Sequence, residues 1–285
     1  GWEQFALRVE TTPVEPPEID ATVIAEEIDG LLKVSVGERT CVFSRAHGKL
    51  ETISRDGKDL LSSGPALQVW RAATDNDGIK SWSGQEGKVL GQWLSAGLDR
   101  MTTRTESFTW KKIPGGGVRV DIKSRRSFPL GENLLDHAHS YMVMPSGTIE
   151  VCDRFTVSAE LPELPRIGVK LMLSPNLEQM QWFGKGPHES YVDRKAGARV
   201  GLHAGSVADQ YVPYILPQEN GNKTDVRWIS LKDTEGMGLV FRIHGVCEAS
   251  ALHFSAEDLY AAFHTNELAP RDEIFLNLDV MQRGL

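Results

Sequence analysis

The chain has 285 residues, of which 40% are hydrophobic and 25% are charged, and its formal net charge is −8 at pH 7. A chain of this length can bury a sizeable core, in one large β domain or two smaller ones. The excess of acidic residues and the lack of a basic stripe argue against a nucleic-acid partner. No apolar run reaches the roughly 18 residues of a membrane-spanning helix, so we expect no membrane partner either.

The first part of the chain is predicted to precede the main domain. Residues 1–10, GWEQFALRVE, are typical of a short strand, which we assign to the end of an upstream domain. Residues 11–28 are rich in proline and glutamate, and proline fixes φ and removes a backbone donor, so we expect an extended linker. The main domain is expected at residues 29–285.

From Leu31 onward, short apolar stretches alternate with polar residues, which indicates strands with one buried face. These stretches lie at 32–36, 118–122, 149–157, 169–173, 239–243 and 274–278, with turn signals at 47–49, 55–59, 114–117 and 144–147. Short helices are predicted at 87–98 and 255–259. The regular helices of a (β/α)₈ barrel are missing, so we expect an all-β fold, a large antiparallel β-sandwich.

The first of three polar clusters is WRAATDNDG, which contains Arg71, Asp75, Asn76 and Asp77, with Trp82 downstream. Carboxylates, amides and guanidinium groups hydrogen-bond to sugar hydroxyls, and aromatic faces pack on sugar C–H surfaces. The cluster is therefore a candidate sugar-binding loop. In the alternative interpretation, Asp75 and Asp77 accept backbone N–H bonds and pair with Arg71 to brace the loop. The spacing does not fit an EF-hand calcium loop.

The second polar cluster follows a Gly-rich turn in the stretch WFGKGPHESYVDR. Glu189, Tyr191, Asp193 and Arg194 lie within six residues there. They are candidates for sugar contact. In the alternative interpretation, Asp193 and Arg194 form an internal ion pair that holds the loop against the sheet.

The third polar cluster, in YVPYILPQENGNKTDVRW, contains Glu219 and Asn220. Both are candidate sugar ligands, and Arg227 is the alternative internal partner of Glu219. His264 is a further candidate, although a lone histidine before a final strand is more often a hydrogen-bonded loop or core residue. No GxSxG motif supports a serine triad.

In chain order, the motifs RAATDND, WFGKGPHESYVDRKAGARVG, YVPYILPQENGNKTDVRW, AAFHTNEL and LNLDVMQRGL resemble the fifth domain of family 2 β-galactosidases. That domain is called the small chain when it is encoded separately. The resemblance runs from about Leu31 to Leu285, and the opening GWEQF resembles the last strand of the preceding immunoglobulin-like domain. It implies a supersandwich similar in fold to galactose mutarotase, within a retaining enzyme that hydrolyses terminal β-galactosides such as lactose.

The resemblance places both catalytic glutamates, with Mg²⁺ and Na⁺, on a central barrel outside this chain. It implies that this chain alone is inactive and has no catalytic residue, cofactor or metal of its own. Its implied roles are to wall the sugar pocket, with the loop from Asp75 to about Lys88 near the pocket mouth, and to support assembly. The implied partners are the barrel and immunoglobulin-like domains, the galactoside substrate and further copies of the enzyme.

Relatives of this kind carry a tryptophan beyond the LNLD strand that forms a platform for the sugar. The chain stops at Leu285 before reaching it, so we expect a truncated domain whose last strands leave an unpaired sheet edge. The expected compartment is the cytoplasm.

Two other functions remain open from the sequence. One is a mutarotase-like epimerase that uses His188 or His264 with Glu189 or Glu219 as an acid–base pair. The other is a free-standing carbohydrate-binding module.

Overall fold

The computed structural model describes residues 3–5, 21–129 and 131–285, and over these residues the fold is all-β, as expected. The strands are β1 (Val23–Ile28), β2 (Leu31–Val36), β3 (Arg39–Ser44), β4 (Lys49–Arg55), β5 (Lys58–Gln68), β6 (Thr102–Lys112), β7 (Val118–Phe128), β8 (Gly131–Val143), β9 (Ile149–Val157), β10 (Arg166–Leu173), β11 (Gln179–Gly186), β12 (Arg199–Ser206), β13 (Lys223–Lys232), β14 (Gly238–Leu252) and β15 (Ile274–Gln282). The helices are α1 (Val89–Ala96) and α2 (Ala256–Ala261), with 3₁₀ turns η1 (Leu98–Arg100), η2 (Ala208–Gln210) and η3 (Thr265–Glu267).

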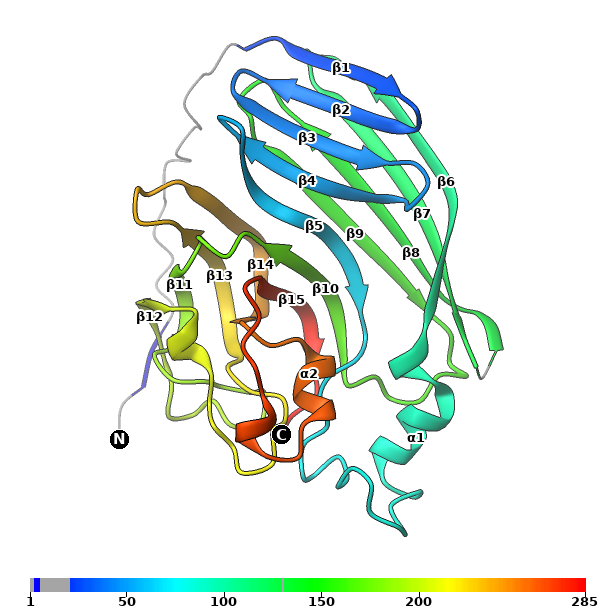
Figure 1. Ribbon diagram of the computed structural model, residues 1–285, viewed down its shortest axis with the longest axis vertical. Coiled ribbons are helices and arrows are strands. Elements are labelled where there is room, and N and C mark those ends of the chain that lie inside the picture. The colour runs from blue at the N-terminus through cyan, green and yellow to red at the C-terminus, as the bar shows by residue number, and fades with distance from the viewer. Residues whose placement is uncertain (1–2, 6–20, 130) are drawn as a thin grey trace.

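The strands form two antiparallel sheets (Figure 1). The large sheet has the order β1-β2-β3-β4-β5-β10-β15-β14-β13-β11-β12, and the second sheet has the order β6-β7-β8-β9. The small sheet lies behind the β1–β5 half of the large one (Figure 1). Their inner faces share one apolar core, in which the rings of Phe43 and Tyr141 meet edge to face at 5.2 Å. The expected sandwich is confirmed.

Strand β5 joins the two halves of the large sheet. Its first residues pair with β4, and the part from Leu61 to Gln68 pairs with β10, with register shifts on both sides. Such shifts bend a strand, and β5 curves along its length in Figure 1.

A second core supports the loop that follows β5. Trp70 at its start packs edge to face against Trp93 of α1 at 6.4 Å and against Tyr260 of α2 at 5.1 Å. Helix α1 ends at Gly97, whose φ of 76° is in the left-handed region that suits a helix C-cap. Helix α2 begins with a capping box, in which the side chains of Ser255 and Asp258 each accept the other residue's backbone N–H.

The predicted strands, turns and short helices are confirmed, but two expectations differ from the structure. The unpaired edge expected at the last strands is wrong, because β15 is hydrogen-bonded to β10 on one side and β14 on the other. Strand β1 occupies residues 23–28, which we had assigned to the linker. The acidic residues Glu26 and Glu27 gave this segment the composition of the linker, but β1 pairs with β2 along its whole length.

The N-terminal assignments lie mostly outside the described residues. This holds for residues 1–2 and 6–10 of the expected upstream strand and for residues 11–20 of the expected linker. Within residues 3–5, the Gln4 side chain exchanges two hydrogen bonds with the backbone of Val200 on strand β12. None of the helices in the described part is long and apolar enough to span a membrane.

Candidate functional site

The loop between β5 and α1 is built on a buried ion pair. Arg71, with none of its side chain exposed, donates from Nη2 to Asp77 Oδ2 at 2.7 Å and to Oδ1 at 2.8 Å. Asp77 Oδ2 also accepts the backbone N–H of Thr74 at 3.0 Å. This confirms the bracing interpretation for Asp77, because a buried carboxylate needs such partners. Asp75 and Asn76, at the tip of the same turn, are exposed.

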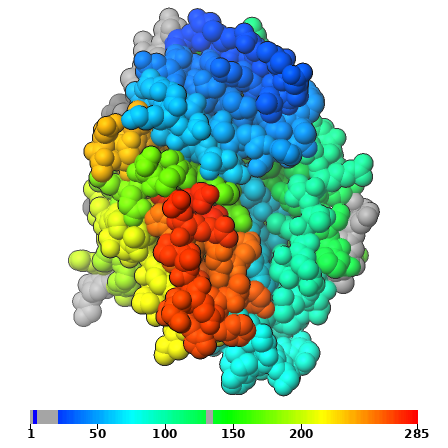
Figure 2. All heavy atoms as spheres, in the orientation of Figure 1, coloured from blue at the N-terminus to red at the C-terminus, as the bar shows by residue number. Residues whose placement is uncertain are grey.

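Residues 283–285 pack against this loop. Arg71 donates to the carbonyl oxygens of Arg283 at 2.6 Å and Gly284 at 2.7 Å. The Asn76 amide donates to the Leu285 carbonyl at 2.9 Å, and the Leu285 N–H donates to Asp193 Oδ1 at 3.2 Å. Asn76 and Asp77 therefore border, with these residues, an open hollow of about 470 Å³. Figure 2 shows the orange-to-red C-terminal part of the chain at the surface, next to the cyan segment that contains this loop.

A second buried arginine lies beneath this region. Arg166 donates from Nη2 to Asp279 at 2.6 Å and from Nη1 to Glu219 at 3.2 Å, and all three side chains are buried. The Glu219 N–H donates to the carbonyl of Ala72, which links this group to the first loop. The expected pair between Glu219 and Arg227 is therefore wrong. Arg166, which is distant in sequence, lies closer in the fold.

Glu248 adds a third carboxylate to this buried group. It lies directly opposite Asp279 across strands β14 and β15. Burial, together with the nearby charge of Asp279, raises the pKa of Glu248 to about 7, and the hydrogen bond from Asn222 opposes the increase. A carboxyl group with this pKa is partly protonated near neutral pH.

The second polar cluster forms a separate site. Glu189 Oε1 accepts hydrogen bonds from Arg194 and from the hydroxyl of Tyr214, and its Oε2 accepts the N–H of Gly221 at 2.8 Å. Arg194 therefore pairs with Glu189, and the expected pair with Asp193 is wrong. Tyr191 is fully buried beside this group, and among the described residues its hydroxyl has no hydrogen-bond partner.

An open hollow of about 550 Å³ lies beside Glu189 and Arg194 and reaches Lys223. Burial lowers the pKa of Lys223 to about 8, and the charge of Glu189 opposes this shift. Asn220 is buried and bonds only within its own loop in the described structure, to Val212 and Gln218. It therefore braces the loop.

Lys80 was not predicted from the sequence, yet it anchors the first loop. Its ammonium group donates to the carbonyls of Tyr260 at 2.7 Å and Leu259 at 3.2 Å, and also to that of Ala262. These carbonyls end helix α2, where the helix dipole favours a cation. A single lysine between Gly78 and Trp82 gives no sign of this role, because its partners lie about 180 residues away.

Two exposed candidates flank this anchor. Trp82 is two residues from Lys80 and is 65% exposed, and His264 is two residues from Ala262 and pairs with Glu267 at 2.8 Å. The candidates thus divide into a buried set that braces and an exposed set that can reach a ligand. The buried or largely buried set is Arg71, Asp77, Glu189, Tyr191, Glu219 and Asn220, and the exposed set is Asp75, Asn76, Trp82, Asp193, Arg194 and His264.

Comparisons with known proteins identify the family to which the chain is similar. A family model described as "Beta galactosidase small chain" matches residues 35–285. The "Beta-galactosidase" of Priestia megaterium is 28% identical over 100% of this chain and 26% of its own length. Proteins of the same name from Halalkalibacterium halodurans (30% identical, 86% of this chain, 23% of its own length) and Lactobacillus delbrueckii subsp. bulgaricus (34%, 80% and 21%) also match. The chain spans about a quarter of the length of these curated relatives.

Proposed function

Because this chain belongs to the β-galactosidase small-chain family, we propose that it is the non-catalytic C-terminal domain of a retaining β-galactosidase. The whole enzyme hydrolyses terminal β-D-galactosides such as lactose. The observation that carries the proposal is the match over residues 35–285, in a chain that spans about a quarter of its β-galactosidase relatives.

In this proposal the loop after β5 walls one side of the sugar pocket. The buried Arg71–Asp77 pair and the Lys80 anchor hold the loop, and the exposed Asp75, Asn76 and Trp82 face the substrate. This division of roles is supported by the burial of the first set and the exposure of the second. A rigid, pre-arranged loop lowers the entropy cost of binding.

The remaining exposed candidates, Asp193, Arg194 and His264, take a secondary part at the rim of the same pocket. For Asp193, this role is supported by its hydrogen bond with Leu285, because Leu285 also bonds to Asn76 and so brings Asp193 beside Asn76. Glu189, Tyr191, Glu219 and Asn220 act indirectly, by holding the loops that carry these residues.

The chemistry is assigned to the barrel of the whole enzyme. A retaining mechanism requires two carboxylates roughly 5–5.5 Å apart, one of them free to attack the sugar. Three of the buried carboxylates described above are instead bound by arginines, Asp77 by Arg71 and both Glu219 and Asp279 by Arg166, and Glu248 is bound by the Asn222 amide, which supports a structural role. The Mg²⁺ and Na⁺ implied by the resemblance likewise belong to the barrel.

The partners follow from the same proposal. They are the barrel and immunoglobulin-like domains of the enzyme, its galactoside substrate and further copies of the assembled enzyme. The cytoplasm remains the predicted compartment.

Complementation tests the proposal directly. The purified chain is expected to give no turnover of o-nitrophenyl β-D-galactoside, and mixing it with the separately produced remainder of the enzyme is expected to restore turnover. Trp82→Ala is expected to raise KM severalfold with little change in kcat. Ile28→Ala is the control, because Ile28 is also an exposed apolar residue (67%) but lies on edge strand β1, which three strands separate from β5. Turnover by the purified chain alone would contradict the proposal.

The two alternative functions have separate tests on the same chain. Faster mutarotation of fresh α-galactose, measured by polarimetry, would favour an epimerase. Heat of binding to galactans at millimolar affinity or tighter would favour a carbohydrate-binding module.

A further inference from the structure

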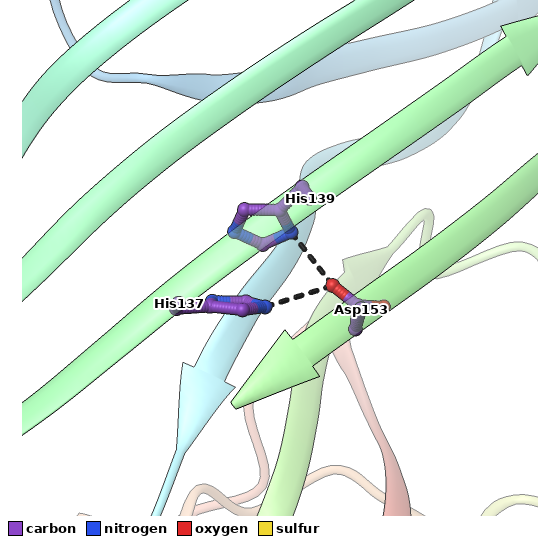
Figure 3. A group of neighbouring side chains, drawn as sticks. All are labelled: His137, His139 and Asp153. Atoms are coloured by element: carbon purple, nitrogen blue, oxygen red, sulfur yellow. Dashed lines mark hydrogen bonds and ion pairs between the residues drawn. The ribbon is translucent and has the colours of Figure 1, made fainter. Parts of the chain in front are cut away.

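Two histidines and an aspartate converge on the inner face of the small sheet (Figure 3). His137 and His139 are two residues apart in β8, so their side chains share one face, and Asp153 in β9 lies opposite His139. Tyr141 is on the same face and packs on Phe43 of the large sheet, which identifies this face as the interior.

The three side chains meet at one oxygen atom. His137 Nε2 lies 2.8 Å and His139 Nδ1 lies 2.7 Å from Asp153 Oδ1, as the dashed lines in Figure 3 show. One potential ligand atom from each residue lies within 4.8 Å of the other two, so a single ion could contact all three. Among the described residues, no other set of three such side chains is grouped this closely.

The chemistry of the set matches a transition-metal ion. Imidazole nitrogen and carboxylate oxygen are ligands of Zn²⁺ and related ions, and hard cations such as Mg²⁺ prefer all-oxygen sites.

Hydrogen bonds within the set do not account for all of its polar atoms. His137 Nδ1 is buried and has no hydrogen-bond partner among the described residues. The same is true of Nε and Nη1 of Arg126, which lies on the same face of the neighbouring strand β7. Buried polar groups in native structures are usually satisfied, so water is expected beside the set, where it can also act as a ligand of an ion.

An ion could reach the set from the edge of the small sheet. Asp153 is on edge strand β9 and keeps 18% of its side chain exposed, whereas the two histidines are almost fully buried. Val151, two residues away on the same face, is 44% exposed. Water can therefore complete the coordination on this side.

We propose that His137, His139 and Asp153 bind one Zn²⁺ ion, which ties strand β8 to edge strand β9. This differs from the sequence-based expectation that the chain has no metal. The sequence feature that could have indicated this site is the pair of histidines in DHAHSY, because alternate residues of a strand lie on the same face. The ion is structural in this proposal and has no part in galactoside cleavage, so its test is independent of the proposed function.

The first experiment measures Zn²⁺ binding by the untagged 285-residue chain. After treatment with EDTA and dialysis, titration calorimetry with ZnCl₂ is expected to show one ion per chain with micromolar affinity or tighter. A differential scan is expected to show a higher Tm with excess Zn²⁺, because a ligand that binds only the folded state stabilises it. Absence of stoichiometric binding would overturn the proposal and leave a hydrogen-bonded triad.

Variants locate the ion. His137→Gln keeps an N–H donor for Asp153 but removes a metal ligand, so Zn²⁺ affinity is expected to fall by at least tenfold while the circular dichroism spectrum is retained. Arg126→Gln removes a nearby positive charge and is expected to tighten binding roughly tenfold. His264→Ala, at the exposed His264–Glu267 pair, is the matched control and should leave affinity unchanged. If the His264 variant loses Zn²⁺ and the other two do not respond, the ion binds at the surface and the proposal is wrong.

Discussion

Arg71 and Arg166 each carry a charged guanidinium group that is almost completely buried. Removing such a charge from water costs several kcal/mol, which only close carboxylates and further hydrogen bonds offset. Arg71 has Asp77 and two carbonyls, and Arg166 has Asp279 and Glu219. Removing one of these carboxylates should therefore lower the free energy of unfolding by more than removing an ordinary surface ion pair does.

Asp77→Ala tests this at the first arginine. The variant leaves the Arg71 charge buried with carbonyl partners only, so we expect the free energy of unfolding to fall by about 3–5 kcal/mol. Urea denaturation followed by circular dichroism measures the change. Asp75→Ala is the control: Asp75 is exposed two residues earlier, and its loss should cost no more than about 0.5 kcal/mol. Equal effects of the two substitutions would contradict the assigned role of Asp77.

Glu248 gives the protein a predictable pH dependence. Its pKa rises from 4.5 to about 7 on folding, so the folded state holds more protons than the unfolded state between these pH values. The contribution of Glu248 to the free energy of unfolding therefore falls as pH rises from about 4.5 to 7.

Glu248→Gln is expected to remove this contribution. At pH 8 the variant should be more stable than the parent by about 3 kcal/mol, and at pH 4 the two should be similar. Urea titrations at several pH values measure the difference in the free energy of unfolding between the two proteins. Contributions from other titrating groups are the same in both and cancel in this difference. Glu235→Gln replaces an exposed glutamate and is the control: it should leave the free energy of unfolding unchanged at both pH 4 and pH 8. A pH-independent difference between Glu248→Gln and the parent would show that Glu248 does not titrate as described.

At the scale of elements, the loop after β5 is held at three places. Trp70 packs between α1 and α2, Asp77 pairs with Arg71, and Lys80 binds the C-terminal end of α2. Between these fixed points the exposed side chains of Asp75 and Asn76 have little freedom of position. The loop is thus a rigid element even though it contains no strand or helix.

Lys80→Met tests the third fixed point. Methionine keeps the apolar stem but leaves the carbonyls of Leu259, Tyr260 and Ala262 without their donor, at a cost of about 1–3 kcal/mol. Hydrogen–deuterium exchange is expected to rise in residues 75–82 and at the end of α2. The exposed Lys88, in the same loop, provides the control as Lys88→Met. Unchanged exchange in the Lys80 variant would mean that the loop does not depend on this anchor.

At the scale of the whole molecule, the sequence predicted which segments are strands better than it predicted how they are arranged. Period-two alternation identified β2, β7, β9, β10, β14 and β15, because one face of each packs on the core or lies near it. The position of β15 between β10 and β14 could not be read locally, since pairing partners lie far apart in the chain.

The same limit explains the outcome at the candidate site. The pair Arg71–Asp77 spans six residues and could be predicted. Arg166 lies 53 residues from Glu219 and 113 from Asp279, so the sequence offered the nearer Arg227 instead. Lys80 was missed because its partners are carbonyls, which carry no residue-type signal.

Two deletions test the importance of strand position. Removing residues 1–28 deletes edge strand β1, which pairs only with β2 in the described structure, and the chain should keep a cooperative urea transition at a lower midpoint. Removing residues 274–285 deletes β15 from the interior of the large sheet and takes away Asp279, one of the two carboxylate partners of Arg166. This variant is expected to lose its near-ultraviolet circular dichroism spectrum. A native spectrum would show that β10 and β14 can close the sheet without β15.

The central position of β15 also sets a condition on biosynthesis. The strand follows every other strand of the described part in sequence, yet β10 and β14 both need it as a neighbour. A nascent polypeptide on the ribosome therefore holds two incomplete half-sheets, each with an open row of amide and carbonyl groups, until residue 282 has left the exit tunnel. Over that interval the chain is most exposed to misassembly, and a chaperone would be of most use then.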